Sequence, residues 1–312
     1  MRRSVVYSVA GAALGLALLL TLAGTADDPE GLPNWQAFAL GVVQGLTELL
    51  PISSSGHLIL VPWASEWTYL EENGRFNQTF DVALHLGTLV AVAGYFWSDL
   101  VRLFVALVGS IGRRRIASDD ERIAWFVVVA TIPAGLAGLL GEDLIADNLG
   151  EPWQILVLLA AGALLLWWAD SFPQRKAMGD LGLKQAVVMG LAQALALAPG
   201  VSRSGITITV GRFLGLDRDS AARFSFLLLL PTVLGAVLLK GVGDVLLGDL
   251  PDGWQGPFLV GTLAALGSGL LAIDWLLGYV RAHTYGIFVV YRLVAAAIVL
   301  LLILSGVRDA TF

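Results

Sequence analysis

Two short polar segments of this apolar chain carry side chains suited to chemistry on an anionic group. Together they supply a carboxylate, a hydroxyl, an imidazole and a guanidinium; in chain order these are Glu48, Ser54, His57 and Arg203. A planar guanidinium binds phosphate oxygens through two parallel hydrogen bonds and keeps its charge in a dry site. A hydroxyl beside an acid or base is a candidate nucleophile. The set predicts transfer of a phosphoryl group, in which stabilisation of charge matters most.

Each of the four side chains has a predicted role. Arg203 is the anion clamp, and Ser54 is the candidate nucleophile that faces the clamped phosphorus. His57 takes the proton of Ser54 or protonates the leaving oxygen, since imidazole titrates near neutral pH. Glu48 orients His57 and raises its basicity, or it helps to hold a divalent cation. Three alternatives stay open: Ser54 as a phosphate donor or structural hydroxyl, an activated water as the attacking group, and Arg203 as an ion-pair partner of Glu48.

Further residues of the two segments are predicted to bind the substrate. Polar side chains donate hydrogen bonds, and glycines let backbone N–H groups approach an anion at the N-terminus of a helix. The predicted binding residues are Gln44, Ser53, Ser55, Gly56, Ser202, Ser204 and Gly205. For the serines, satisfaction of broken backbone and close packing of helices are equally open interpretations.

Other charged or titratable residues in apolar surroundings are expected to be structural. His85, inside a predicted crossing, is expected to be a packing histidine, with a role in the site as the alternative. Asp81, Asp274 and Arg292 lie near predicted helix ends and are expected to extend to the interface or to form pairs. His283, beside a basic residue in a loop, is expected to be solvated.

The composition predicts a membrane protein. Of the 312 residues 57% are hydrophobic and only 14% are charged, and the mean hydropathy is +0.77. A soluble domain usually has about 25% charged residues, which argues against a soluble all-helical protein. The chain has no Cys, so disulfides, thiol catalysis and thiolate metal sites are excluded. The net charge of −6, without a long basic tract, leaves no basis for nucleic-acid binding. No organic cofactor is expected.

Seven apolar runs approach the length of a membrane helix, which is about 20 residues. Six are predicted crossings of a core domain: 79–97, 122–140, 153–169, 223–240, 258–279 and 286–305. The first run, Val5 to Ala23, is predicted to be an uncleaved signal anchor, with a cleaved signal peptide ending near Ala26 as the alternative. The arginine-rich loop 98–122 is predicted to be cytoplasmic and the acidic loop 141–152 to lie outside.

Two further segments, 35–64 and 185–215, must begin and end on the same side, so each is predicted to be a re-entrant helical hairpin. They align without a gap at an offset of 149 residues. Identical pairs begin at Gly41, Gln44, Leu46, Ser53, Ser55 and Gly56. Three predicted crossings separate the hairpins, which inverts the second copy and brings the two loops together near the midplane.

The predicted fold is an all-α integral membrane protein with an inverted-topology repeat. It has two re-entrant hairpins, about six core transmembrane helices and one additional N-terminal helix. The predicted domains are an N-terminal extension, residues 1–33, and a single membrane domain, residues 34–312. The repeat halves of that domain are 34–140 and 183–306.

The two polar segments also resemble a known family. The sequences QGLTELLPISSSGH at 44–57 and PGVSRSG at 199–205 resemble the signature motifs of the undecaprenyl-diphosphatase family, the bacitracin-resistance proteins. Further short matches extend the resemblance over about residues 34 to 306. The N-terminal run precedes the usual start of the family, and Leu49 stands where the family often has Phe.

The resemblance implies an enzyme that hydrolyses undecaprenyl diphosphate to undecaprenyl phosphate and phosphate. This reaction recycles the lipid carrier for cell-wall synthesis and confers bacitracin resistance. The implied site is formed by both re-entrant motifs and opens to the outer face of the bacterial plasma membrane. The family's essential residues fall on Ser54, His57 and Arg203, and its acidic motif on Gln44 and Glu48. A divalent cation, Mg²⁺ or Ca²⁺, is also implied, with Glu48 as its candidate ligand.

The implied partners are a polyprenyl diphosphate lipid and the surrounding membrane lipids, with no nucleic acid, and a homodimer stays open. A lipid-phosphate transporter or flippase is the alternative function, since inverted repeats are typical of transporters. A transporter needs the anion clamp but no nucleophile. Release of phosphate from the lipid therefore distinguishes the two functions.

Overall fold

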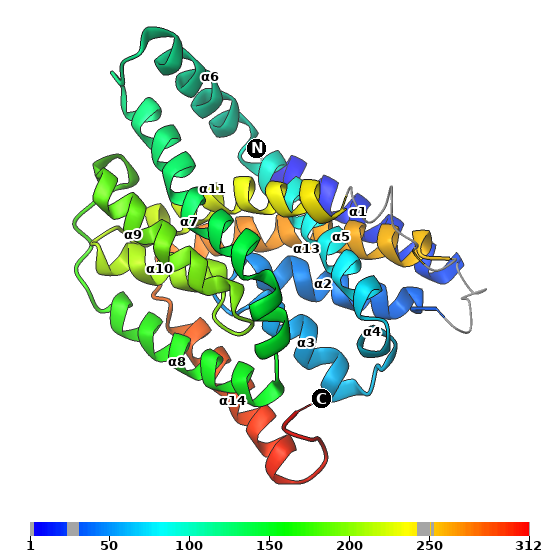
Figure 1. Ribbon diagram of the computed structural model, residues 1–312. Coiled ribbons are helices and arrows are strands. Elements are labelled where there is room, and N and C mark those ends of the chain that lie inside the picture. Colours follow the sequence, from blue (N-terminus) through cyan, green and yellow to red (C-terminus); the bar gives the residue numbers. More distant parts are fainter. Residues whose placement is uncertain (1–2, 24–30, 242–249, 251–252, 312) are drawn as a thin grey trace.

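The structure, a computed structural model, consists of helices joined by short connections (Figure 1). It describes residues 3–23, 31–241, 250 and 253–311, without the side chains of 142–147, 240 and 241. The α-helices in chain order are α1 (Arg3–Ala23), α2 (Asn34–Leu49), α3 (Ser54–Ser65), α4 (Tyr69–Glu72), α5 (Gly74–Tyr95), α6 (Trp97–Arg113), α7 (Asp119–Asn148), α8 (Pro152–Asp170), α9 (Leu183–Ala194), α10 (Arg203–Phe213), α11 (Arg218–Ala236), α13 (Gln255–Val280) and α14 (Gly286–Leu304). The predicted cleavage region near Ala26 lies outside the described residues.

Six of the described helices are long and apolar enough to cross a membrane. They are α1, α7, α8, α11 with its π-helical extension, α13 and α14. These helices confirm five of the six predicted core crossings and the predicted N-terminal helix. The chain is therefore an all-helical, multi-pass membrane protein, as its composition predicts.

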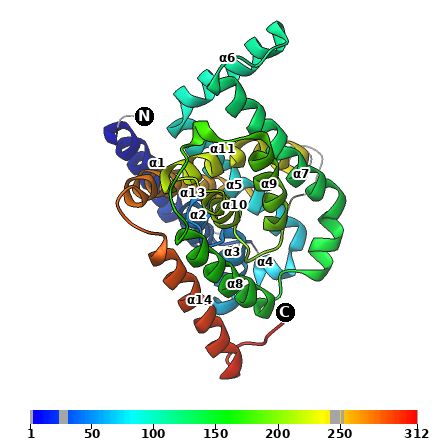
Figure 2. The same ribbon diagram turned by 90° about the vertical axis from the view of Figure 1, so that its left-hand side faces the viewer.

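The predicted crossing 79–97 is the one that does not appear as a single straight membrane-spanning helix. It corresponds to α5, which turns by 81° at Phe96 into α6. α6 projects from the other helices in both views (Figures 1 and 2). The segment predicted as a loop, 98–122, is therefore mostly helical. Apolar residues recur at helical spacing between the charged ones and form one face of the helix, which includes Phe104 and Val108. α6 is therefore an amphipathic helix.

The two predicted hairpins are α2–α3 and α9–α10, and their loops have nearly the same backbone conformation. Ser53 precedes α3 with φ 76° and ψ 94°, and Ser202 precedes α10 with φ 75° and ψ 116°. Positive φ is uncommon in residues other than glycine. Each serine hydroxyl caps its helix by accepting a backbone N–H, from Gly56 at 3.3 Å and from Gly205 at 3.0 Å. The repeat in the sequence is thus also a repeat of structure.

Each hairpin packs on a long helix of the other half. α2 packs on α13, and α9 packs on α7, as can be followed in Figure 1. The repeated first glycine of each hairpin permits this approach. A Cβ at Gly41 would collide with the carbonyl of Gly261, and a Cβ at Gly190 would collide with the carbonyl of Ala130. This exchange of partners interlocks the two halves.

The N-terminal helix α1 packs against α13 through a face of small residues. Its buried residues are Val6, Ala10, Ala13 and Ala17. At one end, Arg3 Nε lies 3.3 Å from Asp274 Oδ1, and the Tyr7 hydroxyl donates to Asp274 Oδ2 at 3.0 Å. Asp274 is therefore paired, one of the two predicted outcomes, and α1 is part of the folded body.

Candidate active site

The two re-entrant loops contact each other directly. The backbone N–H of Gly200 donates to Ser53 Oγ at 3.2 Å, and the Ser204 hydroxyl donates to the carbonyl of Leu50 at 2.8 Å. Both bonds join residues about 150 positions apart in sequence. The predicted meeting of the loops is confirmed, and it gathers the polar residues of both motifs into one buried region.

Glu48 is the centre of this region. It is 4% exposed, and its two carboxylate oxygens have different partners. Oε1 forms an ion pair with Arg203 Nη2. Oε2 accepts the hydroxyl hydrogen of Ser54 and the Nε2–H of Gln44, the latter at 3.3 Å, and it lies 3.5 Å from His85 Nε2. One carboxylate therefore joins the candidate nucleophile of the first loop to the candidate clamp of the second.

Arg203 begins α10 and reaches across the loop contact. Its Nη1 donates to the Thr232 hydroxyl at 3.1 Å, while Nη2 faces Glu48. The ion pair with Glu48, one of the alternatives that the sequence leaves open, is thus formed in the structure. The Arg203 side chain is 18% exposed, so it is less enclosed than Glu48, whose side chain is 2% exposed.

His57 lies in the same region but makes different contacts from those predicted. Its Nδ1–H donates to the carbonyl of Ser53 at 2.6 Å, and its Nε2 lies 2.8 Å from the Tyr291 hydroxyl. The two rings are stacked with centroids 5.6 Å apart. Because the bond to Ser53, one helical turn back, fixes the ring, His57 faces α14. Glu48 contacts Ser54 directly and does not orient His57 among the described contacts.

Two residues of this region were not among the predicted site residues. For His85 on α5 packing is expected, with a role in the site as the alternative; its Nδ1–H donates to the carbonyl of Asp81 at 2.7 Å, and its Nε2 faces Glu48. Tyr291 on α14 contacts His57. The available signal was a polar pair, Tyr291 and Arg292, within an otherwise apolar crossing, where ionisable residues usually have a function.

The other predicted binding residues lie in the two loops and at the starts of α3 and α10, where they contact one another and the backbone. The hydroxyls of Ser53 and Ser202 cap helices, and the Ser202 and Ser204 hydroxyls lie 3.2 Å apart. Ser55 is half-buried on the first turn of α3. Gly56 and Gly205 donate their N–H groups to the capping serines. These contacts fit the structural interpretation of the serines, and their contact with a substrate stays a prediction.

The resemblance implies a divalent cation, which the described residues alone do not enclose. Among them, no group of three or more His, Cys, Asp or Glu side chains is arranged to hold a metal ion. Both oxygens of Glu48 already have partners. A cation bound here would need ligands from the substrate, as Mg²⁺ does when it binds one carboxylate and phosphate oxygens.

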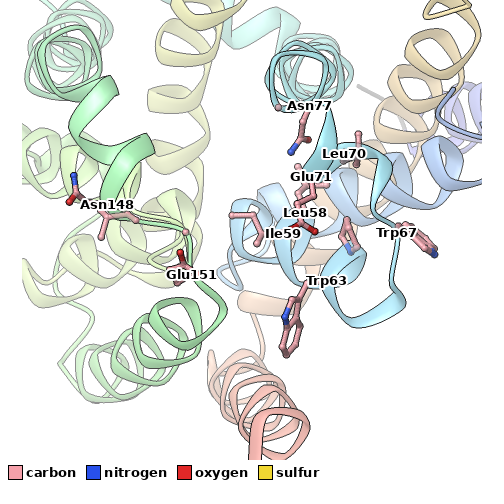
Figure 3. A pocket seen from close by; sticks show the side chains of 13 residues that line it. Leu58, Ile59, Trp63, Trp67, Leu70, Glu71, Asn77, Asn148 and Glu151 are labelled. Atoms are coloured by element: carbon pink, nitrogen blue, oxygen red, sulfur yellow. The ribbon is translucent and has the colours of Figure 1, made fainter. Parts of the chain in front are cut away.

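A cavity of about 310 Å³ opens along α3, beginning at Leu58, the residue after His57. Figure 3 shows Ile59 and Trp63 of α3 on one side of it, and on the other Asn148, the last residue of α7, and Glu151, which precedes α8. The lining combines apolar and aromatic side chains, several of them on α3, with polar and acidic ones, and the two kinds contribute about equally; the polar ones are Glu71, Asn77, Asn148 and Glu151. Its apolar side along α3 can contact a hydrocarbon chain, and Glu48, Ser54, His57 and Arg203 are not among the residues that line it.

The fold and the site together define a membrane-embedded protein with two interlocked re-entrant hairpins and an acid–serine–arginine cluster between them. The chain belongs to the family described as Bacitracin resistance protein BacA, which it matches over residues 37–298. This match confirms the family that the motifs predict.

Named relatives support the same assignment. A protein of Thermomicrobium roseum is 44% identical over 284 residues, which is 88% of this chain and 99% of the relative. A protein of Geobacter metallireducens is 46% identical over 272 residues, 86% of this chain and 98% of the relative. One of Pelotomaculum thermopropionicum is 42% identical over 269 residues, 86% and 96% of the two chains. Each is named undecaprenyl-diphosphatase.

Proposed function

We propose that this protein hydrolyses undecaprenyl diphosphate to undecaprenyl phosphate and phosphate, recycling the lipid carrier for cell-wall synthesis and conferring bacitracin resistance. The family and the name of its relatives support the substrate. The observation that carries the chemistry is the shared carboxylate: Glu48 contacts Ser54 and Arg203 at once. That arrangement places a base beside a hydroxyl and a cation beside that base.

The first step begins with the Ser54 hydroxyl, whose proton is already directed at Glu48. Glu48 accepts that proton as Ser54 Oγ forms a bond to the terminal phosphorus. The bond between this phosphorus and the bridging oxygen breaks, and undecaprenyl phosphate leaves with the electron pair. In the second step water attacks the phosphoserine, Ser54 recovers a proton, and phosphate is released.

Arg203 has two positions in this scheme. In the free protein it neutralises Glu48. An arriving phosphate, which carries more negative charge than a carboxylate, draws the guanidinium into a bidentate contact. Glu48 then has less cationic support and becomes a better proton acceptor for Ser54. Binding of the substrate thereby activates the base, and Arg203 stabilises the charge of the transition state.

His57 is the second acid–base group of the proposal. Its Nε2, which faces the Tyr291 hydroxyl, is the atom that shuttles a proton during hydrolysis of the phosphoserine. A divalent cation held by Glu48 and the diphosphate would neutralise phosphate charge. The first isoprenoid units of the substrate lie in the cavity along α3, against the apolar side chains of Leu58, Ile59 and Trp63.

The test is phosphate release from undecaprenyl diphosphate by purified protein in detergent. We expect activity in the wild type and its loss in Ser54→Ala, Arg203→Ala and His57→Ala. His283→Ala, which changes an exposed loop histidine, is the control and should keep full activity. A phosphorylated Ser54 peptide should be trapped by rapid quenching and mass spectrometry. A wild-type preparation that binds the lipid but releases no phosphate would favour the transporter instead.

We further propose that the protein lies in the bacterial plasma membrane with its site open to the outer face. The arginines of segment 98–122 and the acidic residues of segment 141–152 support this orientation, because cytoplasmic segments are enriched in basic residues. Segment 141–152, predicted as a loop, is helical as far as Asn148, the last residue of α7. The chain has no Cys, so single cysteines are clean reporters. Leu149→Cys should react with an impermeant maleimide from outside, and Arg115→Cys should not. The reverse pattern would overturn the orientation.

A further inference from the structure

Arg292 is a buried cation on α14 that the proposed reaction does not use. It is 1% exposed. Its Nε donates to the carbonyl of Leu159 at 3.0 Å, and its Nη2 donates to the carbonyl of Leu158 at 3.1 Å. Both carbonyls belong to α8, so one side of the guanidinium is fixed to a membrane-crossing helix.

The other side of the same guanidinium contacts both re-entrant loops. Its Nη1 donates to the carbonyl of Pro51 in the first loop at 3.3 Å, and its Nη2 donates to the carbonyl of Gly200 in the second at 3.0 Å. Both terminal nitrogens also lie 3.3 Å from the carbonyl of Val201. A single planar group thus joins the two loops to each other and to α8.

The surroundings are shaped for this group. A Cβ at Gly162 on α8 would overlap Arg292 Nη2, and a Cβ at Gly205 would lie 2.9 Å from Nη1. Among the described residues the hydrogen-bond partners of Arg292 are backbone carbonyls, without a carboxylate. Arg212, a second fully buried arginine, also contacts carbonyls but has Asp170 beside it at 3.4 Å.

The contacts of Arg292 satisfy carbonyls that the broken backbone of the two hairpins leaves without helical partners. Glu48 and Ser54 belong to one hairpin and Arg203 to the other, and broken backbone at membrane depth leaves carbonyls without helical partners. A guanidinium offers five donors in a rigid plane, so it satisfies several carbonyls and fixes their separation at once. Tyr291, the preceding residue, holds His57 from the same helix.

We infer that Arg292 is a positioning residue that sets the register between the two re-entrant loops, so that Glu48, Ser54 and Arg203 meet. The inference rests on the proposed function only for its kinetic readout. Its structural readout, the exchange of loop amides, is independent of any reaction. Failure of one can therefore be distinguished from failure of the other.

The main variant is Arg292→Lys, which keeps the positive charge but replaces a fork of donors with one nitrogen that cannot bridge both loops. We expect kcat to fall by about 10²-fold, the effect of a misplacement near 1 Å, with KM changed much less. Hydrogen exchange followed by mass spectrometry should become faster in peptides 50–57 and 198–206. The Gly200 amide, which donates to Ser53, is among those reported.

Arg212→Lys is the matched control, since it changes an equally buried arginine that contacts carbonyls away from the loops. It should lower thermal stability while leaving the kcat of folded protein near the wild-type value. Its faster exchange should be confined to 170–176 and 212–217. If Arg292→Lys does not fold, Gly162→Ala displaces the guanidinium without removing it and should loosen the same two loop peptides.

Two results would overturn the inference. One is an Arg292→Lys protein with wild-type kcat; if Arg292→Gln then loses activity, the role belongs to charge and not to bridging. The other is unchanged exchange in both loop peptides of Arg292→Lys or Gly162→Ala. Should the wild type release no phosphate, the exchange measurements still decide the matter.

Discussion

The two re-entrant loops share nearly the same backbone conformation but carry side chains of different chemical character. Ser53 and Ser202 occupy equivalent positions, with φ of 76° and 75°, and both cap the helix that follows. The next residue is Ser54 in the first loop and Arg203 in the second. The repeat thus presents one position twice, and a difference at that position yields a candidate nucleophile facing a cation.

A second difference lies one turn before the loops. Gln44 and Gln193 are equivalent in the repeat, and both are buried. Gln44 Nε2 donates to Glu48, whereas the residue equivalent to Glu48 in the second half is Leu197. Among the described residues, neither amide atom of Gln193 has a hydrogen-bond partner. The first half therefore supplies the acid and the second the cation, on scaffolds that otherwise match.

The largest expected effect comes from making the loops alike. Arg203→Ser turns the second loop into a copy of the first, Ser-Ser-Ser-Gly, which already adopts this backbone at positions 53–56. We expect the protein to fold and kcat to fall by roughly 10³- to 10⁵-fold, the usual contribution of an arginine to phosphoryl transfer. Phosphate release and thermal unfolding measure the two effects. Activity within tenfold of wild type would contradict the role of Arg203.

The interlocking of the halves predicts a matched pair of stability effects. Gly41→Ala and Gly190→Ala each place a methyl group against a backbone carbonyl of the other half. Each should destabilise the protein by about 1–3 kcal/mol, the range for overpacking, as measured by thermal unfolding in detergent. Gly138→Ala on α7, where a Cβ would meet nothing within 4 Å, is the control and should be neutral or stabilising. If Gly190→Ala left thermal stability unchanged while Gly41→Ala lowered it, the two glycines would not be equivalent in packing.

The smallest effect separates the two capping serines. Ser53→Ala and Ser202→Ala each remove a helix cap, which usually costs about 1 kcal/mol. Ser202→Ala also removes the contact with the Ser204 hydroxyl, but that hydroxyl keeps the carbonyl of Leu50 as its acceptor. Ser53 accepts the N–H of Gly200 from the other loop, so Ser53→Ala leaves a buried donor unsatisfied and should cost roughly 1 kcal/mol more. Thermal unfolding of the two variants side by side tests this. Equal losses would show that the contact between the loops adds no stability.

Much of the fold follows from patterns local to the sequence. Long apolar runs, glycine and proline interruptions and a gapless repeat predict the crossings and both hairpins, because a helix in lipid must satisfy its own backbone. The prediction fails at 98–122, where five arginines suggest a loop. The physical reason is that only Arg102 and Arg113 of these arginines belong to α6, where they lie about three turns apart on one face, while apolar residues form the other face. The other three arginines follow the helix.

The sequence by itself determined which residue types are present at membrane depth and which segments carry them. Glu48 precedes the helix break of the first hairpin and Ser54 and His57 follow it, while Arg203 follows the break of the second hairpin. Only the tertiary structure decided the partners. It turns Glu48 toward Ser54 and His57 toward Tyr291, and it places His85 and Arg292 against the site. Spacing along a helix sets which residues share its face, but the packing of helices distant in sequence sets what that face meets.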